Sequence, residues 1–162
     1  MALCAVLAAL ALGLSTLESL FPVTALVPVP GVKLGLANIV TVFALYQLGA
    51  PEALTILLVR CLLGGLFAGN VSAMLFSTLG GLAAMGVMIL LRRWKGLSIY
   101  GVSIGGAAAH NIGQMAAAVI TLGSTMVLGY LPFLLAVSLF TGTLTGFVTA
   151  LLLRATAHIR FR

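Results

Sequence analysis

Long apolar stretches separated by short polar or helix-breaking clusters dominate the chain. The stretches run for about 20 residues, which is the length a helix needs to cross the hydrocarbon core of a bilayer. Prolines, Gly-Asn turns and a basic cluster interrupt them. The pattern predicts six spans: Ala2 to Phe21, Lys33 to Leu48, Glu52 to Ala68, Val71 to Leu91, Leu97 to Leu122 and Thr125 to Leu153. We therefore predict an all-α integral membrane protein, a six-transmembrane-helix bundle that forms a single domain over residues 1–162.

The composition supports this prediction and excludes a soluble enzyme. Hydrophobic residues make up 62% of the chain, charged residues 6%, and the mean hydropathy is +1.29. A soluble globular domain carries about 25% charged residues, so this chain cannot cover itself with a water-soluble surface. The first apolar stretch has no basic residues before it, and we interpret it as a true span and not as a cleaved signal.

The basic residues predict the orientation in the membrane. With six spans and both termini inside, one basic residue, Lys33, lies at the outer face. The inner face carries Arg92, Arg93, Lys95, Arg154, Arg160 and Arg162. This distribution follows the positive-inside rule. It also explains the net charge of +6 without a nucleic acid partner, and it places the protein in the cytoplasmic membrane as a multi-pass protein.

Small residues recur at four-residue spacing along the first span, at Ala5, Ala9 and Gly13. Such a stripe lies on one helix face and lets another backbone approach closely. The same spacing occurs at Gly65/Gly69, Gly101/Gly105 and Gly142/Gly146. Packing inside the bundle explains any one of these motifs. The stripe on the first span is the best candidate for docking an external partner.

Ionisable and amide side chains inside the predicted spans are candidate functional residues, because they are costly in a bilayer. Arg60 lies near the middle of the third span. His110, Asn111 and Gln114 share one face of the fifth span, since they are three and four residues apart. A ligand site is one explanation. Structural hydrogen bonds, between helices or from Arg60 to backbone carbonyls, are the other.

Three further polar residues lie near the predicted outer face. Asn38 lies about one turn into the second span, Lys33 lies at the outer end of that span, and a proline-rich loop precedes both. Glu18 lies near the outer end of the first span, where it either pairs with Lys33 or controls access to a cavity. Because Lys33, Arg60 and His110 have no acidic partner deep in the bundle, we expect the cavity to favour an anionic or carbonyl-rich ligand.

The chain lacks the usual catalytic and cofactor motifs. Its only acids are Glu18 and Glu52, predicted at opposite membrane faces, so it has no carboxylate cluster to hold Mg²⁺ for prenyl or phosphoryl transfer. It has no P-loop and no nucleophile motif. Its two cysteines, Cys4 and Cys61, form no metal motif. We expect no enzyme activity, no cofactor and no metal site.

Two segments resemble a known family. They are PGVKLGLANI, from Pro30 to Ile39, and GAAAHNIGQ, from Gly106 to Gln114. Together they are similar to the Gx transporter family, also labelled heptaprenyl diphosphate synthase component I, and the resemblance extends over nearly the whole chain. That family in turn resembles the substrate-binding S components of energy-coupling-factor transporters. The resemblance implies an S-component-like six-helix bundle that captures a vitamin-like solute under the loop between its first two spans. It also implies docking to a transmembrane coupling component and two ATPases through the small residues of span one.

The leading hypothesis is thus a solute-binding membrane subunit of a bacterial uptake transporter. The ligand residues would be Lys33, Asn38, Arg60, His110, Asn111 and Gln114. An alternative is a non-catalytic membrane subunit that presents a prenyl lipid to a soluble heptaprenyl diphosphate synthase. A third is a scaffold in which these polar residues only hold helices together.

Overall fold

The computed structural model describes residues 2–20 and 35–158, which form six α-helices joined by short connections. The helices are α1 (Ala2–Leu20), α2 (Leu36–Gln47), α3 (Ala50–Ala68), α4 (Val71–Arg92), α5 (Ile99–Leu122) and α6 (Leu131–Ala155). A 3-10 helix, η2 (Thr125–Tyr130), precedes α6. No strand occurs in the described residues. The all-α fold and the number of helices agree with the prediction.

The helix ends lie where the sequence carries stop and start residues. Gly69 ends α3 in the left-handed conformation at φ 59°, and its N–H binds the carbonyls of Gly65 and Leu66. Asn70 then begins α4, because its side chain accepts a hydrogen bond from the N–H of Ala73 at 3.0 Å. Ser98 begins α5 in the same way, and Gly123 ends it at φ 63°.

The sixth predicted span is divided in the structure. Residues 125–130 form the 3-10 helix η2, and the α-helix starts only at Leu131. Pro132 lies in the first turn of α6, where its missing N–H breaks no helical hydrogen bond. Pro132 therefore lies at the start of the α-helix and not within a continuous helix from Thr125.

The described helices differ in their capacity to span a bilayer. Three helical segments are long and apolar enough to cross a membrane: Ala50–Ala68, Val71–Arg92 and Thr125–Ala155. Ala2–Glu18 and Leu36–Gln47 are shorter apolar helices. The 12 residues of α2 extend about 18 Å, less than the roughly 30 Å hydrocarbon core. The chain is thus a membrane protein, while six complete crossings and their orientation stay a prediction.

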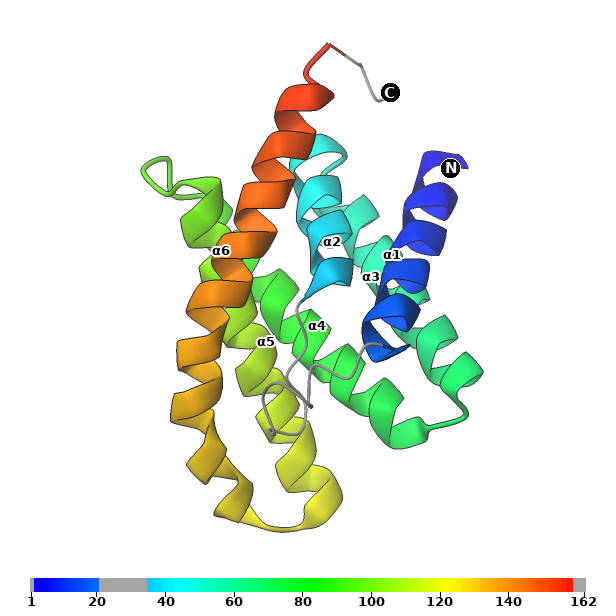
Figure 1. The fold of residues 1–162 in the computed structure, drawn as a ribbon, viewed down its shortest axis with the longest axis vertical. Coiled ribbons are helices and arrows are strands. Elements are labelled where there is room, and N and C mark those ends of the chain that lie inside the picture. The colour runs from blue at the N-terminus through cyan, green and yellow to red at the C-terminus, as the bar shows by residue number, and fades with distance from the viewer. Residues whose placement is uncertain (1, 21–34, 159–162) are drawn as a thin grey trace.

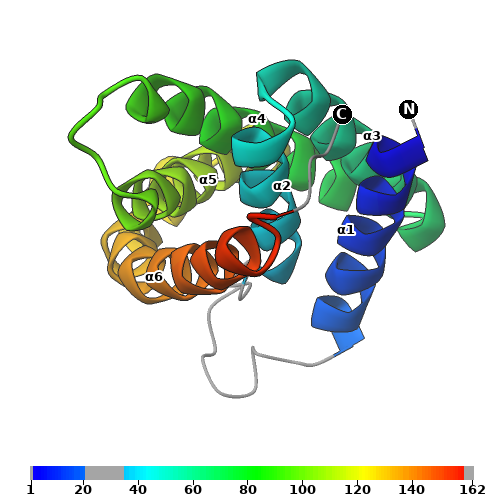
Figure 2. The same ribbon diagram turned by 90° about the horizontal axis from the view of Figure 1, so that it is seen from above.

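The helices form one bundle around α2. Figure 1 shows the start of α1, the α4–α5 connection and the end of α6 toward one end of the molecule. The turns that join α3 to α4 and α5 to α6 lie toward the other end. Viewed along the bundle, α2 lies between α1 and α6, and it contacts both of them as well as α3 (Figure 2). Helix α5 packs mainly on α4 and α6.

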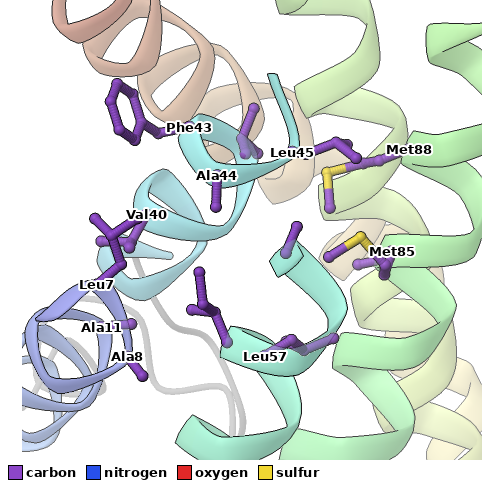
Figure 3. Packing of buried hydrophobic residues seen from close by; sticks show 14 of the residues in the cluster. Leu7, Ala8, Ala11, Val40, Phe43, Ala44, Leu45, Leu57, Met85 and Met88 are labelled. Atoms are coloured by element: carbon purple, nitrogen blue, oxygen red, sulfur yellow. The ribbon is translucent and has the colours of Figure 1, made fainter. Parts of the chain in front are cut away.

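The hydrophobic core lies where α1 to α4 meet. Leu45 of α2 and Leu57 of α3 are almost fully buried, and they face Met85 and Met88 of α4 (Figure 3). On the other side of the core, small residues of α1 such as Ala11 bring that helix close to Val40 of α2. The small side chains allow a close approach, while the flexible methionines fill the irregular space left between larger ones.

Glycines bring α5 into backbone contact with both of its neighbours. A Cβ added to Gly113 of α5 would lie 2.6 Å from the carbonyl oxygen of Leu79 in α4. A Cβ added to Gly142 of α6 would lie 2.6 Å from the Cα of Ile104 in α5. Gly142 and Gly146, which the sequence marked as a small-residue pair, thus pack inside the bundle.

A methyl group at Gly142 should therefore destabilise the bundle, while one at Gly86 should not. We expect Gly142→Ala to lower the free energy of unfolding by about 1–3 kcal/mol, because the clash is with backbone that cannot move aside. Gly86 has nothing within 4 Å of an added Cβ, so Gly86→Ala should be neutral or stabilise the helix by up to about 1 kcal/mol. Thermal unfolding of both variants in the same detergent measures the difference. Equal stabilities would contradict the close α5–α6 contact.

Candidate functional site

A polar cavity lies inside the bundle and receives residues from all six α-helices. Among its lining residues are Asn38 of α2, Arg60 of α3, and His110, Asn111 and Gln114 of α5. Its remaining lining residues are Ser15, Glu18, Gly35, Ala37, Ser77, Ala107, Thr141 and Thr145. The structure thus brings together five of the six residues predicted as ligand-binding. Lys33, the sixth, and the proline-rich loop with Pro22, Pro28 and Pro30 lie outside the described residues.

Gly80 of α4 makes room for two of the α5 side chains. A Cβ at Gly80 would lie 2.9 Å from Cε1 of His110 and 2.9 Å from Cγ of Gln114. Both side chains therefore pass directly over the α4 backbone. Gln114 is buried, with 4% of its surface exposed. Because Gly80 has no side chain, His110 and Gln114 can lie against α4 at the wall of the cavity.

Asn111 has a structural role in addition to its place at the cavity. Its Nδ2 donates a hydrogen bond of 2.8 Å to the backbone carbonyl of Leu134 in α6. This is the interhelical bond that the sequence offered as the alternative explanation for the α5 polar residues. Such bonds contribute about 1 kcal/mol in membrane proteins. Because Asn111 Nδ2 already donates this bond, Asn111 has less hydrogen-bonding capacity left for a ligand.

Glu18 joins the end of α1 to the start of α2. Its carboxylate accepts a hydrogen bond of 2.6 Å from the N–H of Gly35, the residue at the N-terminus of α2. A negative charge there also interacts favourably with the α2 dipole. Glu18 is 6% exposed and lines the cavity. The sequence predicted no acidic partner deep in the bundle for Arg60 and His110. In the structure the buried carboxylate of Glu18 lines the same cavity as these two residues.

Arg60 is the charged group with unmet hydrogen-bonding capacity. It is 8% exposed, and its Nε and Nη2 atoms are buried without a hydrogen-bond partner in the described part of the chain. Guanidinium keeps its charge and its five N–H donors at any physiological pH. Buried donors without partners cost free energy, so these two atoms are groups at the cavity wall that retain the capacity to form hydrogen bonds.

The polar cavity is small, and a larger groove lies beside it. The cavity volume is about 40 Å³, enough for roughly three water molecules. The groove lies between α1, α3 and α4 and has a volume of about 260 Å³. Arg60, Ser15 and Ser77 line both spaces. Arg60 thus stands at their common wall. Since ligand pockets usually have about 300–1,000 Å³, the polar cavity as it stands is too small for a vitamin-sized solute.

The predicted docking stripe faces outward. Ala5, Ala9 and Gly13 of α1 are all exposed, and nothing lies within 4 Å of a Cβ added to Gly13. The opposite face of α1 carries the buried residues Ala8 and Ala11. Packing within the bundle therefore does not account for this stripe, in contrast to Gly142/Gly146.

Sequence reasoning did not single out the hydroxyl residues of the cavity. Thr141 and Thr145 are four residues apart on α6, and Ser15 lies three residues before Glu18 on α1. Residues at these spacings share a helix face. The only indication in the sequence that these residues line a cavity was thus that polar residues recur at helical spacing in an apolar span. Hydroxyls alone are common in membrane helices, where they bond to their own backbone, and the pattern is not specific.

Comparison with known proteins gives one result. A family model described as heptaprenyl diphosphate synthase component I matches residues 7–152. No curated protein and no solved structure matches the chain. The matched range includes part or all of each of the six α-helices and every cavity residue named above.

The two arginines that belong to different environments should respond oppositely to the same substitution. We expect Arg60→Met to raise the free energy of unfolding of the ligand-free protein by about 1–3 kcal/mol, because it removes buried donors without partners. Arg92→Met should lower it by about 1 kcal/mol. Arg92 Nη1 donates to the carbonyl of Leu45, and its guanidinium lies 5.1 Å from the centre of the Tyr46 ring.

Chemical or thermal unfolding of the two variants in one detergent measures these shifts. A loss of stability in Arg60→Met as large as that in Arg92→Met would show that Arg60 is a structural anchor.

Proposed function

The chain belongs to the heptaprenyl diphosphate synthase component I family, as its two motifs predict, and we propose that it acts as a solute-binding membrane subunit of a bacterial uptake transporter. The observation that carries this proposal is the convergence of polar side chains from all six helices on one cavity around Arg60, whose Nε and Nη2 atoms have no partner among the described residues. A scaffold needs no such convergence. Polar groups that are buried in a membrane bundle and keep unmet hydrogen-bonding capacity are expected at a binding site.

The distribution of charge supports a cavity that faces the outside. The exposed basic residues Arg92, Arg93, Lys95 and Arg154 lie at the end of the bundle where α4 and α6 finish. The positive-inside rule assigns this end to the cytoplasm. The cavity lies toward the other end, because it contains Glu18 near the end of α1 and Asn38 near the start of α2. Solute would then reach it from the outer side of the cell membrane.

The positions of the two acids support a role without catalysis. Glu18 lies in the last turns of α1 and binds Gly35, whereas Glu52 lies in the first turn of α3, at the other end of the bundle. They cannot jointly hold the Mg²⁺ that prenyl transfer normally requires. The family description would then refer to a subunit that accompanies a synthase and not to the catalytic chain.

The exposed stripe on α1 is the proposed contact with a partner. A surface of Ala5, Ala9 and Gly13 is smooth enough for a second helix to approach closely. The described bundle would bind solute, and a transmembrane coupling component with ATPase subunits would supply the energy for release inward. No cofactor or metal is required for this role.

The family description itself favours a second candidate function. In that case the protein presents a prenyl lipid to a soluble synthase, which would bind near Arg92, Arg93 and Lys95 at the basic end. The two candidates differ in what the purified protein carries and in what it purifies with.

Native mass spectrometry of the protein purified from its own host tests the function directly. We expect a bound metabolite with an acidic group, present in the wild type and in Gln47→Leu but lost in Gln114→Leu. Gln114 lines the cavity, whereas Gln47 lies at the far end of α2 and bonds to Thr156 at 3.3 Å. A bound prenyl diphosphate would instead support the second candidate. A protein that carries neither would contradict both and favour the scaffold.

Substitution of Gly13 tests the docking stripe. We expect Gly13→Leu to reduce recovery of the ATPase subunits with the tagged protein by about ten-fold, because a leucine there interrupts a close helix contact. Solute binding and thermal stability should not change, since the position is open. Gly86→Leu is the matched control, because Gly86 is also helical, exposed and free of neighbours. Equal recovery of ATPases with both variants would remove α1 from the interface.

A further inference from the structure

The groove beside Arg60 differs from the polar cavity in its shape and chemistry. Helix α1 contributes Leu12, Ser15 and Thr16, and α4 contributes Ala73 and Ser77. The remaining wall comes from α3: Arg60, Cys61, Gly64, Gly65, Phe67 and Ala68. Phe67 is 73% exposed, and Ala68 and Ala73 are exposed as well. The groove therefore opens on the outer surface of the bundle, between α1 and the hairpin of α3 and α4, where a membrane protein meets lipid.

The electrostatics of the two spaces differ because of one residue. Among the described residues, Arg60 is the only charged one that lines the groove, whereas the polar cavity also contains the carboxylate of Glu18. Glu18 does not line the groove, so an anion on the groove side of Arg60 meets the guanidinium with serine hydroxyls beside it. The unpartnered Nε and Nη2 atoms supply two charge-assisted donors, which suit a carboxylate or a phosphate.

The rest of the groove is suited to an apolar group. Beyond Arg60 its wall consists mainly of aliphatic and aromatic carbon and of glycine, and small residues at Gly64, Ala68 and Ala73 leave the space open. A Cβ at Gly64 would lie 3.5 Å from Leu12 Cδ1, in ordinary van der Waals contact, so a larger side chain at this position would extend into the space between α3 and α1. A volume of about 260 Å³ next to a buried cation fits a molecule with a charged group at one end and a hydrocarbon portion at the other.

We propose that Arg60 and the groove bind an amphipathic anion, with its carboxylate or phosphate on the guanidinium and its apolar part between α1, α3 and α4. This inference rests on the proposed function, since it names the chemical class of the solute.

The same chemistry has two natural sources, a free amphiphile and an anionic membrane lipid. Decyl phosphate is a suitable probe because it carries both parts, and inorganic phosphate carries the charge alone. Binding is measured by calorimetry on the full chain in phosphatidylcholine nanodiscs, with empty nanodiscs subtracted. We expect decyl phosphate to bind at least about ten-fold more tightly than inorganic phosphate.

Substitutions in the groove and at Arg60 test the two parts of the site separately. Gly64→Leu should fill the groove and weaken decyl phosphate binding by about ten-fold or more, as should Ala73→Leu from the opposite wall. Gly86→Leu, on an open face of α4, should bind like the wild type. Arg60→Met should lose binding, and Arg60→Lys should recover part of it, because lysine restores the charge without the planar fork. Thermal unfolding of each variant confirms that it is folded. If Gly64→Leu does not fold, Ala73→Leu takes its place in the test.

The outcomes distinguish this inference from the proposed function. If Gly64→Leu and Ala73→Leu bind decyl phosphate like Gly86→Leu, the groove is not part of the site and the inference is wrong. A hydrophilic metabolite found on the native protein would then still support the proposed function. If phosphatidylglycerol in the nanodiscs competes with decyl phosphate, the natural ligand is an anionic membrane lipid. If phosphatidylglycerol does not compete, the natural ligand is a free amphiphile. Either result supports an amphipathic anion as the ligand of the groove.

Discussion

The close backbone contact of α5 with α4 and α6 is the constraint on which the rest of the molecule depends. Gly113 lies against the carbonyl of Leu79, and Gly142 lies against the backbone of Ile104. In lipid, helices gain little from hydrophobic burial against one another, so packing at this distance must supply much of the association energy. It also sets the position of the α5 polar face. With larger residues at these crossings, His110 and Gln114 would lie farther from Arg60, and the bundle would lose the polar cavity that they line.

In contrast to these close contacts, α1 and α3 are separated in part by the groove. The same bundle therefore contains a well-packed side formed by α4, α5 and α6 and a more open side at the groove. Arg60 lies where the two sides meet. A cation with unpartnered donors is tolerated there because the packed side fixes its surroundings, and under the proposed function the open side would admit its ligand.

Much of this arrangement could be predicted from the sequence, and the limits have physical causes. Helix number and most boundaries follow from local features such as Gly69-Asn70 and Ser98, which act within one or two turns. The grouping of Asn38, Arg60, His110, Asn111 and Gln114 was predicted because polar residues in apolar spans must turn inward. The inward carboxylate of Glu18 and the groove were not, since both depend on how far apart two helices pack. A sequence gives the face of a helix far better than the distance to its neighbour.

Helix α1 connects the two surfaces proposed to bind other molecules. Its outer face carries Ala5, Ala9 and Gly13, while Leu12 and Ser15 on its other side line the groove. It contacts mainly α2 and α3, and its buried residues there include small ones such as Ala8 and Ala11. A partner that bound the outer stripe and shifted α1 would alter the width of the groove, because Leu12 of α1 lies opposite Gly64 of α3. Binding of the partner and release of the ligand would then be coupled through a single helix, without a second gate elsewhere in the bundle.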